Sequence, residues 1–486
     1  MAPIILRVDN RIHVPHEGVS PAVQKLLRET CEHENPEFKK KRAMGYATYD
    51  TPAIIRTWKN EPDELTLPRG AMSRVREVLR EKRLAFGVKD HRTKGAPNFH
   101  HPLEYVGHAP RPYQLDASKR CFQLEQGIVR AATGSGKTTT ALYTSTVIGL
   151  NTLMVLPSVK LLDQTVEVAD KLLGLTGNKV GIIQGAQRRL RPFTVATQQT
   201  LWSREVDEEI REYFGVVMVD EAHHAAARTF GEVIDQFPAR YRLAFSADER
   251  RKDRKEFLVY DAFGNVLHET TREACEEAGA VVDVEVRVVM SDFQAPWYTG
   301  DSDFNRLLDE MIADEKRNDL IVDIAREELK AGEQVIVCTH RREHVRSLDG
   351  ALVAFGVNSG AMLGGQDAAD EKEFEHTRNG LRSGTVEAGV GTYGALGEGI
   401  DLPAVAVGIA ATPITSNKQK FNQYRGRLCR PSEGKTQGRL YVIFDRRVFD
   451  ERAFSNILAW NRTVKVKRNG QWVDARKVDR RAIIAA

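Results

Sequence analysis

The sequence predicts an α/β protein in which two doubly wound parallel-sheet domains follow one another and a small α+β domain precedes them. Apolar runs such as VVMV at 216–219 lack the alternation of a half-exposed strand, which is typical of strands buried on both faces. Short apolar runs alternate with helical stretches from about residue 106. The same alternation restarts after a region near 285–315, which indicates a second sheet.

The first block, residues 1–105, has a different pattern. The segment IILRVDNRIHV alternates apolar and polar residues as a strand does, and two amphipathic stretches with helical spacing follow it. A basic cluster, Lys39 to Arg42, lies beside Tyr46 and Tyr49. Such residues could grip phosphates and stack on bases, although a solvated helix end is the simpler interpretation. We therefore predict an accessory domain that could engage DNA.

The remaining chain divides into three parts by the same patterns. We expect the first sheet domain at 106–290, the second at 291–460 and a basic tail at 461–486. The tail contains eight Lys or Arg residues and two Asp residues, so it could follow a phosphate backbone or simply fray into solvent.

The composition restricts the class of protein. The net charge of the 486 residues is only +4, so any basic surface must be local. The five cysteines are widely spaced, which favours neither a disulfide framework nor a zinc site and fits a reducing cytoplasm. The N-terminal residues lack the apolar core of a signal peptide, and no long apolar run predicts a membrane span.

A glycine-containing loop is the strongest local signal. It follows the apolar run GIVRA and opens a helical stretch, so its N–H groups and the helix N-terminus would form an anion site for phosphates. Lys137 would reach the β and γ phosphates of ATP, and the Thr138 hydroxyl would ligate Mg²⁺. A chance glycine turn is the alternative. The loop consists of Ala131, Ala132, Thr133, Gly134, Ser135, Gly136, Lys137 and Thr138.

A second signal is the buried apolar run that ends in Asp220 and Glu221. At the carboxyl end of a parallel strand, these acids would face the crevice where ligands bind. Asp220 would hold Mg²⁺ and Glu221 would polarise the attacking water. An acidic helix start is the alternative for the pair alone.

The two motifs together resemble the superfamily 2 helicases, whose signature is the box Asp-Glu-Ala-His found here at 220–223. The resemblance implies two RecA-like domains that use ATP and Mg²⁺ on nucleic acid. It extends to RPYQ, in which Arg111 and Gln114 would recognise adenine, since an amide can pair with two adenine atoms. The resemblance also implies backbone contacts to nucleic acid through Pro157, Thr197 and Thr392.

Two further motifs of the family lie in the second half of the chain. VGTYGALGEGIDLP resembles motif V, which implies that Gly399 and Asp401 face the nucleotide. QYRGRLCR resembles motif VI, which implies that Gln423, Arg427 and Arg430 stabilise the charge of the transferring phosphoryl group. A surface helix with arginines is the alternative for any one of them.

Within the superfamily, the sequence resembles the branch of XPB-type and UvsW-type DNA helicases. That branch usually has Thr and Pro where this chain has Asp248 and Glu249, and extra carboxylates near phosphate could weaken ATP binding or coupling. We expect a DNA helicase or translocase that acts in repair, recombination or fork remodelling. Two alternatives stay open: the motor subunit of a restriction system, and an ATP-controlled clamp that does not unwind.

Overall fold

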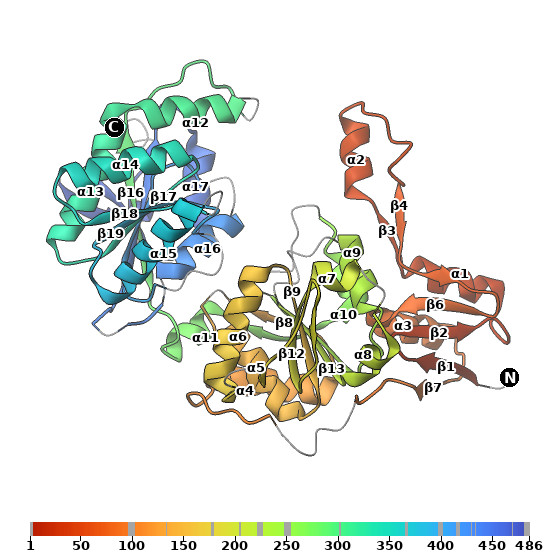
Figure 1. The fold of residues 1–486 in the computed structure, drawn as a ribbon. Coiled ribbons are helices and arrows are strands. Elements are labelled where there is room, and N and C mark those ends of the chain that lie inside the picture. Colours follow the sequence, from red (N-terminus) through yellow and green to blue (C-terminus); the bar gives the residue numbers. More distant parts are fainter. Residues whose placement is uncertain are drawn as a thin grey trace. The chain divides into compact units, whose positions relative to one another are not determined.

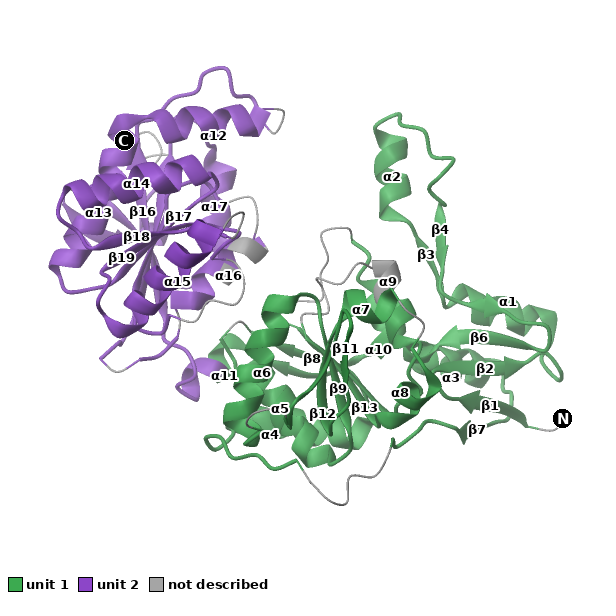
Figure 2. Cartoon of the chain, viewed as in Figure 1, with its two compact units in different colours: residues 1–274 green, residues 275–486 purple. Residues whose placement is uncertain are grey.

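The computed structural model describes residues 3–95, 103–132, 134–175, 179–203, 206–220, 227–246, 254–300, 303–364, 368–396, 402–414, 418–428, 430–432, 434–468 and 470–480. The chain divides into two compact units, residues 1–274 and 275–486 (Figure 2). Each unit is described below by itself. Among the described residues, no helix combines the length and the apolar character that a membrane span requires.

The first unit begins with the small α+β domain that the sequence predicts. Its sheet has the order β5-β6-β2-β1-β7. Strand β1 alternates buried and exposed residues, so one face of the sheet is apolar. Helices α1 (Pro21–Glu29) and α3 (Met72–Glu81) bury apolar residues in the same core as that face. The strands are β1 (Ile4–Val8), β2 (Arg11–Pro15), β5 (Lys59–Asn60), β6 (Glu64–Pro68) and β7 (Phe86–Asp90), and the 3₁₀ helix η1 spans Arg69–Ala71.

An arm extends from this domain (Figure 1). It consists of the two-stranded sheet of β3 (Glu32–Glu34) and β4 (Ile54–Arg56), with helix α2 (Pro36–Ala43) and a tip loop between the strands. The tip loop leads from the end of α2 to β4, so the arm is one continuous excursion of the chain.

The second part of the first unit is an eight-stranded sheet of order β11-β10-β12-β9-β13-β14-β8-β15. Every described pair in it is parallel except β10 with β11, and a hydrophobic core lies on each face. This explains the uninterrupted apolar runs of the sequence. The strands are β8 (Gln126–Ala131), β9 (Thr152–Leu156), β10 (Gly181–Gln184), β11 (Gln187–Arg189), β12 (Phe193–Thr197), β13 (Val216–Asp220), β14 (Tyr241–Ser246) and β15 (Val266–Thr270).

Helices cover both faces of this sheet. Helices α4 (Pro112–Leu124), α5 (Lys137–Ile148) and α6 (Val159–Leu173) contribute to one core, and α8 (Glu208–Tyr213), α9 (Ala227–Ile234) and α10 (Phe257–Phe263) contribute to the other. The short helices α7 (Gln198–Trp202) and α11 (Arg272–Glu277) complete the described helices.

The second unit repeats the architecture with a sheet of order β18-β19-β17-β20-β21-β16-β22-β23. Its strands are β16 (Val284–Ser291), β17 (Val335–Thr339), β18 (Ser359–Met362), β19 (Ala388–Thr392), β20 (Val407–Ala410), β21 (Gly438–Asp445), β22 (Val464–Arg468) and β23 (Gln471–Asp474). Its helices are α12 (Phe304–Ala313), α13 (Glu315–Lys330), α14 (Arg342–Ala354), α15 (Ala368–Ser383), α16 (Lys418–Leu428) and α17 (Glu451–Trp460), and a 3₁₀ helix, η4, spans Ala475–Lys477. The predicted α/β class is confirmed.

Two predicted boundaries need correction. The second unit begins at residue 275, and not at 291, because β16 pairs with β21 in the second sheet over its whole length. The segment 461–480 is not a frayed tail, because β22 pairs with β16 and β23 pairs with β22. The N-terminal domain has its own sheet and core, and it belongs to the same compact unit as the first sheet domain.

Candidate nucleotide-binding site

The loop between β8 and α5 has the conformation that a phosphate cradle requires. Gly134 and Gly136 have φ angles of +89° and +79°, a region that residues with a Cβ rarely adopt. Helix α5 begins at Lys137, directly after the loop, so its first N–H groups and its positive dipole end are directed into the loop. Ala131 ends strand β8 and Ala132 follows it, whereas Thr133 lies outside the described residues.

The predicted metal ligands lie together. Asp220 is the last residue of β13, a central strand of the first sheet, and the Oγ1 of Thr138 donates a hydrogen bond to its Oδ2 at 3.2 Å. A hydroxyl and a carboxylate are the oxygen ligands that Mg²⁺ prefers, so these two residues fit the ion. Glu221 lies outside the described residues, so its predicted role stays a prediction.

The donor set of the loop also fits an anion. Ser135 is only 1% exposed, and its Oγ has no hydrogen-bond partner among the described residues. A buried hydroxyl without a partner is costly, and a phosphate oxygen would accept its hydrogen bond. The loop thus supplies a donor that the described protein does not use.

Two residues of the segment RPYQ hold the loop from behind. The Tyr113 hydroxyl donates to the carbonyl oxygen of Ser135 at 2.8 Å, and the Gln114 Nε2 donates to the same oxygen at 3.2 Å. The Gln114 Oε1 accepts from the N–H of Arg111 at 2.9 Å, which closes the start of α4. A Cβ on Gly136 would lie 2.9 Å from the Gln114 Nε2, and the φ of +79° at this position also disfavours any residue with a Cβ.

This arrangement bears on the predicted adenine contact. The structure engages both ends of the Gln114 amide within the protein, so Gln114 positions the phosphate loop. Adenine recognition by Arg111 and Gln114 stays a prediction. The sequence did not predict the hydrogen bond from Tyr113 to the loop. The only signal for it was the place of Tyr113 beside Gln114.

The three predicted nucleic-acid contacts lie where their strands end. Thr197 is the last residue of β12 and Thr392 is the last residue of β19, while Pro157 follows β9. The Thr197 hydroxyl is hydrogen-bonded to the hydroxyl of Thr200 at 2.8 Å. The Thr392 hydroxyl accepts from the N–H of Ala395 at 3.1 Å. Both hydroxyls therefore order the turns that follow, and contact with nucleic acid stays a prediction.

Helix α16, which carries the predicted arginines, is anchored in the second unit by their neighbours. The Tyr424 hydroxyl donates to the carbonyl oxygen of Ile336 on β17 at 2.9 Å. Arg425 donates through Nη1 to the Oδ1 of Asn461 at 2.7 Å and to the carbonyl of Trp460 at 2.9 Å. These contacts assign Tyr424 and Arg425 to holding the helix in place.

The predicted arginines lie close to these anchors. Arg427, in the last turn of α16, and Arg430, just after it, are half-buried. Burial raises the pKa of the Cys338 thiol on β17, and its hydrogen bond with Tyr424 and the nearby charge of Arg427 oppose that rise. The described structure does not cover the Gln423 side chain, Gly399 or Asp401.

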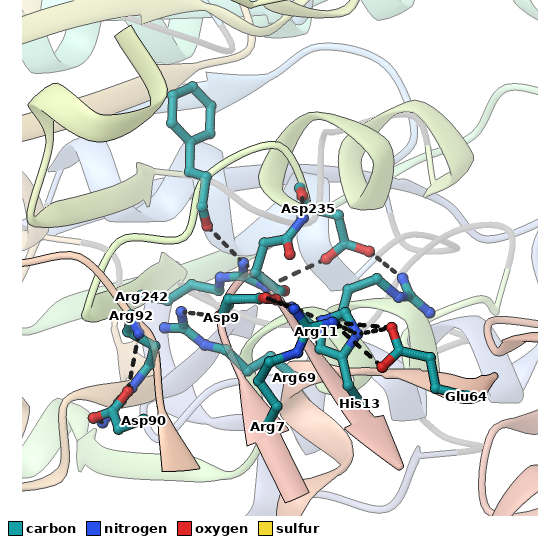
Figure 3. Close-up of polar contacts among 12 residues, drawn as sticks. Arg7, Asp9, Arg11, His13, Glu64, Arg69, Asp90, Arg92, Asp235 and Arg242 are labelled. Atoms are coloured by element: carbon teal, nitrogen blue, oxygen red, sulfur yellow. Dashed lines mark hydrogen bonds and ion pairs between the residues drawn. The ribbon is translucent and has the colours of Figure 1, made fainter. Parts of the chain in front are cut away.

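The sequence did not predict how the N-terminal domain docks onto the first sheet domain. Arg242 on β14 is fully buried and donates from Nη2 to the carbonyls of Asn10 at 3.0 Å and Phe237 at 3.0 Å (Figure 3). Arg69 of η1 is also buried and donates to the carbonyl of Ala239 at 2.6 Å. Asp235, just after α9, forms ion pairs with Arg11 of the N-terminal domain and with Arg242 of the first sheet domain, so one carboxylate links the two domains (Figure 3).

A second junction centres on Asp261 of α10. This buried carboxylate accepts hydrogen bonds from His33 Nε2 at 2.8 Å and Thr57 Oγ1 at 2.5 Å, and it pairs with Arg74. Burial alone raises the pKa of Asp261, but the His33 hydrogen bond and the charge of Arg74 outweigh burial and lower it. The base of the arm is therefore fixed to the first sheet domain.

Comparisons with known proteins agree with these features. A family described as "Type III restriction enzyme, res subunit" matches residues 107–250. The "Putative DNA 3'-5' helicase Rad25" of Halobacterium salinarum is 28% identical over 354 residues, covering 70% of this chain and 55% of that protein. The "DNA 3'-5' helicase XPB" of Kineococcus radiotolerans is 25% identical, covering 71% of this chain and 61% of that protein. A mimivirus protein, "Putative ATP-dependent RNA helicase L396", is 27% identical, covering 67% and 63%.

Solved structures show the same fold at low identity. Yeast Dbp5 bound to RNA and ADP BeF3 matches with a TM-score of 0.52 and 15% identity, covering 74% of this chain and 90% of that one. The Hef helicase domain of Pyrococcus furiosus matches with a TM-score of 0.51 and 16% identity, covering 71% and 98%. The predicted tandem RecA-like fold is confirmed. The first three sequence relatives are matched over only 55%, 63% and 61% of their own lengths.

Proposed function

We propose that this chain, which belongs to the superfamily 2 helicases of the XPB-like type, hydrolyses ATP and uses the energy to move along DNA. The observation that carries the proposal is the pairing of Thr138 with Asp220 beside a glycine-shaped phosphate loop. The three sequence relatives named above all carry helicase names. Two of those names specify DNA, which favours DNA as the substrate.

Each residue of the site has a proposed role. Lys137 and the loop N–H groups bind the β and γ phosphates, and Glu221 orients the attacking water. Thr138 and Asp220 hold Mg²⁺, which when bound neutralises charge on the phosphate oxygens. Arg427, Arg430 and Gln423 are assigned to stabilising the charge of the transferring phosphoryl group. Gly399 and Asp401 are assigned to nucleotide binding.

Movement along DNA would follow from alternating grip. Residues of both units are assigned to the γ phosphate, so its release after hydrolysis would remove the group on which both sets of residues act. Pro157 and Thr197 would hold the backbone from the first unit and Thr392 from the second. Because these contacts are to phosphates, binding should weaken as salt rises.

The experiment that tests the function is an ATPase assay with separate nucleic acids. The parent and the Lys137→Ala variant are measured with no nucleic acid, single-stranded DNA, duplex DNA, forked DNA and RNA. We expect DNA to stimulate hydrolysis in the parent and the variant to lose at least ~100-fold in kcat, the scale of one lost charge-stabilising group. Hydrolysis that survives in Lys137→Ala would refute the assigned site, and stimulation by RNA alone would refute the DNA assignment.

A restriction-system motor is a second candidate, favoured by the family match over residues 107–250. Such motors share the ATPase core but work with a nuclease centre, so a plasmid-nicking assay with ATP and Mg²⁺ separates the two functions. Strand displacement without nicking supports the helicase, and ATP-dependent nicking supports the restriction motor. ATP turnover with neither activity would favour the clamp that Asp248 and Glu249 allow.

The cysteines support a reducing compartment, so we also propose a cytoplasmic location. Cys31, Cys121, Cys275 and Cys338 are buried and form no disulfide among the described residues, and burial raises the pKa of Cys31 to about 11 and that of Cys121 to about 12. High thiol pKa values keep these groups protonated and unreactive at neutral pH.

A further inference from the structure

The arm of the N-terminal domain, residues 32–56, contains a helix that adds no residue to the hydrophobic core of that domain. Helix α2 has no buried residue, whereas α1 and α3 of the same domain each bury two apolar side chains. A helix that contributes nothing to a core is an unusual use of ordered chain, since ordering each residue costs about 1–2 kcal/mol. We therefore infer that the arm has a role other than stabilising the fold.

The tip loop is nevertheless held in a fixed form. Asn35 caps α2 by accepting the N–H of Glu37 at 3.1 Å, and its Nδ2 donates to the carbonyl of Pro52 at 2.8 Å, which ties the two ends of the excursion together. Lys41 on α2 donates to Thr51 at 2.6 Å and pairs with Asp50 at 3.1 Å. These contacts hold the loop against the helix, so the residues at the tip are preorganised.

Large apolar side chains gather at this tip. Gly45, with φ of +71°, ends the helix in a left-handed turn, and the residues around it point into solvent. Met44 is 58% exposed, Tyr46 is 66% exposed and Tyr49 is 94% exposed. A rigid loop that presents two solvated tyrosines is typical of a surface that binds a flat partner.

The charge beside the tyrosines specifies the chemistry of that partner. The segment 36–56 contains five basic residues and two acidic ones. Lys39 pairs with Glu34 and Lys41 with Asp50, but Lys40 and Arg42 have no ion-pair partner among the described residues. Aromatic faces next to unneutralised cations match unstacked bases on a phosphate backbone.

The base of the arm is coupled to the motor. The ring of His33 stacks on Phe257 of α10 with centroids 4.2 Å apart, and Lys255, just before α10, pairs with Glu37 of α2 at 3.3 Å. The segment before Lys255 contains Asp248 and Glu249, which stand where the XPB-type and UvsW-type branch usually has Thr and Pro. The arm therefore contacts α10, the helix that follows this segment in the chain.

We propose that the tip of the arm is a binding site for single-stranded DNA. Tyr46 and Tyr49 stack on bases, while Lys40 and Arg42 contact phosphates. The inference rests on the proposed function for its biological sense, since it gives the motor a second place to hold the displaced strand. Its physical basis, the exposure and charge of the tip, is independent of ATP.

The test is a titration of the full chain, without nucleotide, against a short fluorescent single-stranded DNA. We expect Tyr46→Ala/Tyr49→Ala to weaken binding about tenfold or more, and Tyr46→Phe/Tyr49→Phe to keep it, because stacking needs only the ring. We expect Lys40→Ala/Arg42→Ala to reduce the slope of log K against log salt by about 1.4, near 0.7 for each lost phosphate contact. Phe355→Ala is the matched control, since Phe355 is 57% exposed in the second unit.

Three comparisons make the outcome decisive. Equal affinity of the tyrosine-to-alanine variant and the parent would overturn the proposal, and so would an equal loss on blunt duplex DNA, whose bases offer no free faces. Unchanged thermal unfolding excludes misfolding of the variants. The Lys137→Ala protein should bind the same DNA as the parent does, so a failure of the ATPase assignment is separable from a failure of the arm.

Discussion

The hydroxyl of Thr138 lies 3.2 Å from the Oδ2 of Asp220, although the two residues are 82 positions apart in the chain. Thr138 lies in the first turn of helix α5, and Asp220 ends the central strand β13. Their approach depends on the parallel pairing that brings β8 next to β14 and β14 next to β13. The geometry of the proposed metal site is thus fixed by the sheet.

Substitution of Thr138 by valine should raise the Mg²⁺ concentration needed for ATPase activity. Valine keeps the shape and removes the oxygen ligand, so we expect a loss of about tenfold to a hundredfold in kcat/KM at limiting Mg²⁺, in the range of a disturbed ligand set. The measurement is ATPase rate against Mg²⁺ concentration. Thr146→Val is the control on the same helix, because the Thr146 hydroxyl only donates to the carbonyl of Tyr143. An equal effect of both substitutions would contradict the metal role.

The arginines near the end of α16 should separate into two classes. Loss of Arg427 or Arg430 should lower kcat by about 10³-fold or more, because charge on the phosphoryl group is no longer stabilised. Arg425→Ala should instead lower the free energy of unfolding by about 1–3 kcal/mol, since it removes the contacts to Trp460 and Asn461. Steady-state kinetics and urea unfolding of the three variants check the split. A large drop in kcat with unchanged stability in Arg425→Ala would show that the anchor was assigned wrongly.

Replacing Asp248 by threonine should increase ATP affinity. A carboxylate near the phosphates repels them, so its removal should lower KM for ATP several-fold while hydrolysis persists in both proteins. The measurement is the ATPase activity of Asp248→Thr beside the parent, with Asp309→Thr as a surface control. A very large gain in kcat would mean that the natural motif is crippled.

The pKa of Asp261 predicts how the N-terminal domain responds to acid. Because the folded-state pKa is lowered, the carboxylate stabilises the fold above its unfolded value of about 4, and this stabilisation is lost as pH falls through the folded value. Asp261→Asn should therefore lower the free energy of unfolding by about 3 kcal/mol at neutral pH, and by progressively less as pH falls below about 4 toward the lowered pKa of the folded state. Unfolding curves of the parent and the variant at several pH values show whether their free energies of unfolding become equal in acid. Asp309→Asn removes an exposed pair with Arg341 and should change little at any pH.

The residues of the proposed nucleotide site could be predicted from the sequence. A phosphate loop and an acid at a strand end are each recognised in a short segment, so Lys137, Thr138 and Asp220 were predicted without knowledge of the hydrogen bond between Thr138 and Asp220. The strand β16 could not be placed in the same way, because one buried strand resembles another and only its pairing with β21 shows its sheet. Strand β22 alternates apolar and basic residues from Val464 to Lys467, a strand pattern that the prediction of a basic tail overlooked.

Docking of the N-terminal domain was beyond sequence reasoning for a different reason. Arg11 and Asp235 are 224 positions apart, and in the sequence each is an ordinary charged residue. Arg242 lies in a strand of apolar residues, which signals a buried charge but not its partners. Such ion pairs depend on residues that become neighbours only in the folded chain, so a short sequence pattern does not predict them.

Gly70 gives the junction an unexpected vulnerability. A Cβ at this position would lie 2.2 Å from the carbonyl oxygen of Tyr260 and 2.5 Å from that of Asp261, both backbone atoms of α10. One methyl group at position 70 would therefore push η1 away from α10 without removing any charged side chain. Such a substitution could loosen the N-terminal domain from the first sheet domain, although it replaces no residue that is assigned to ATP.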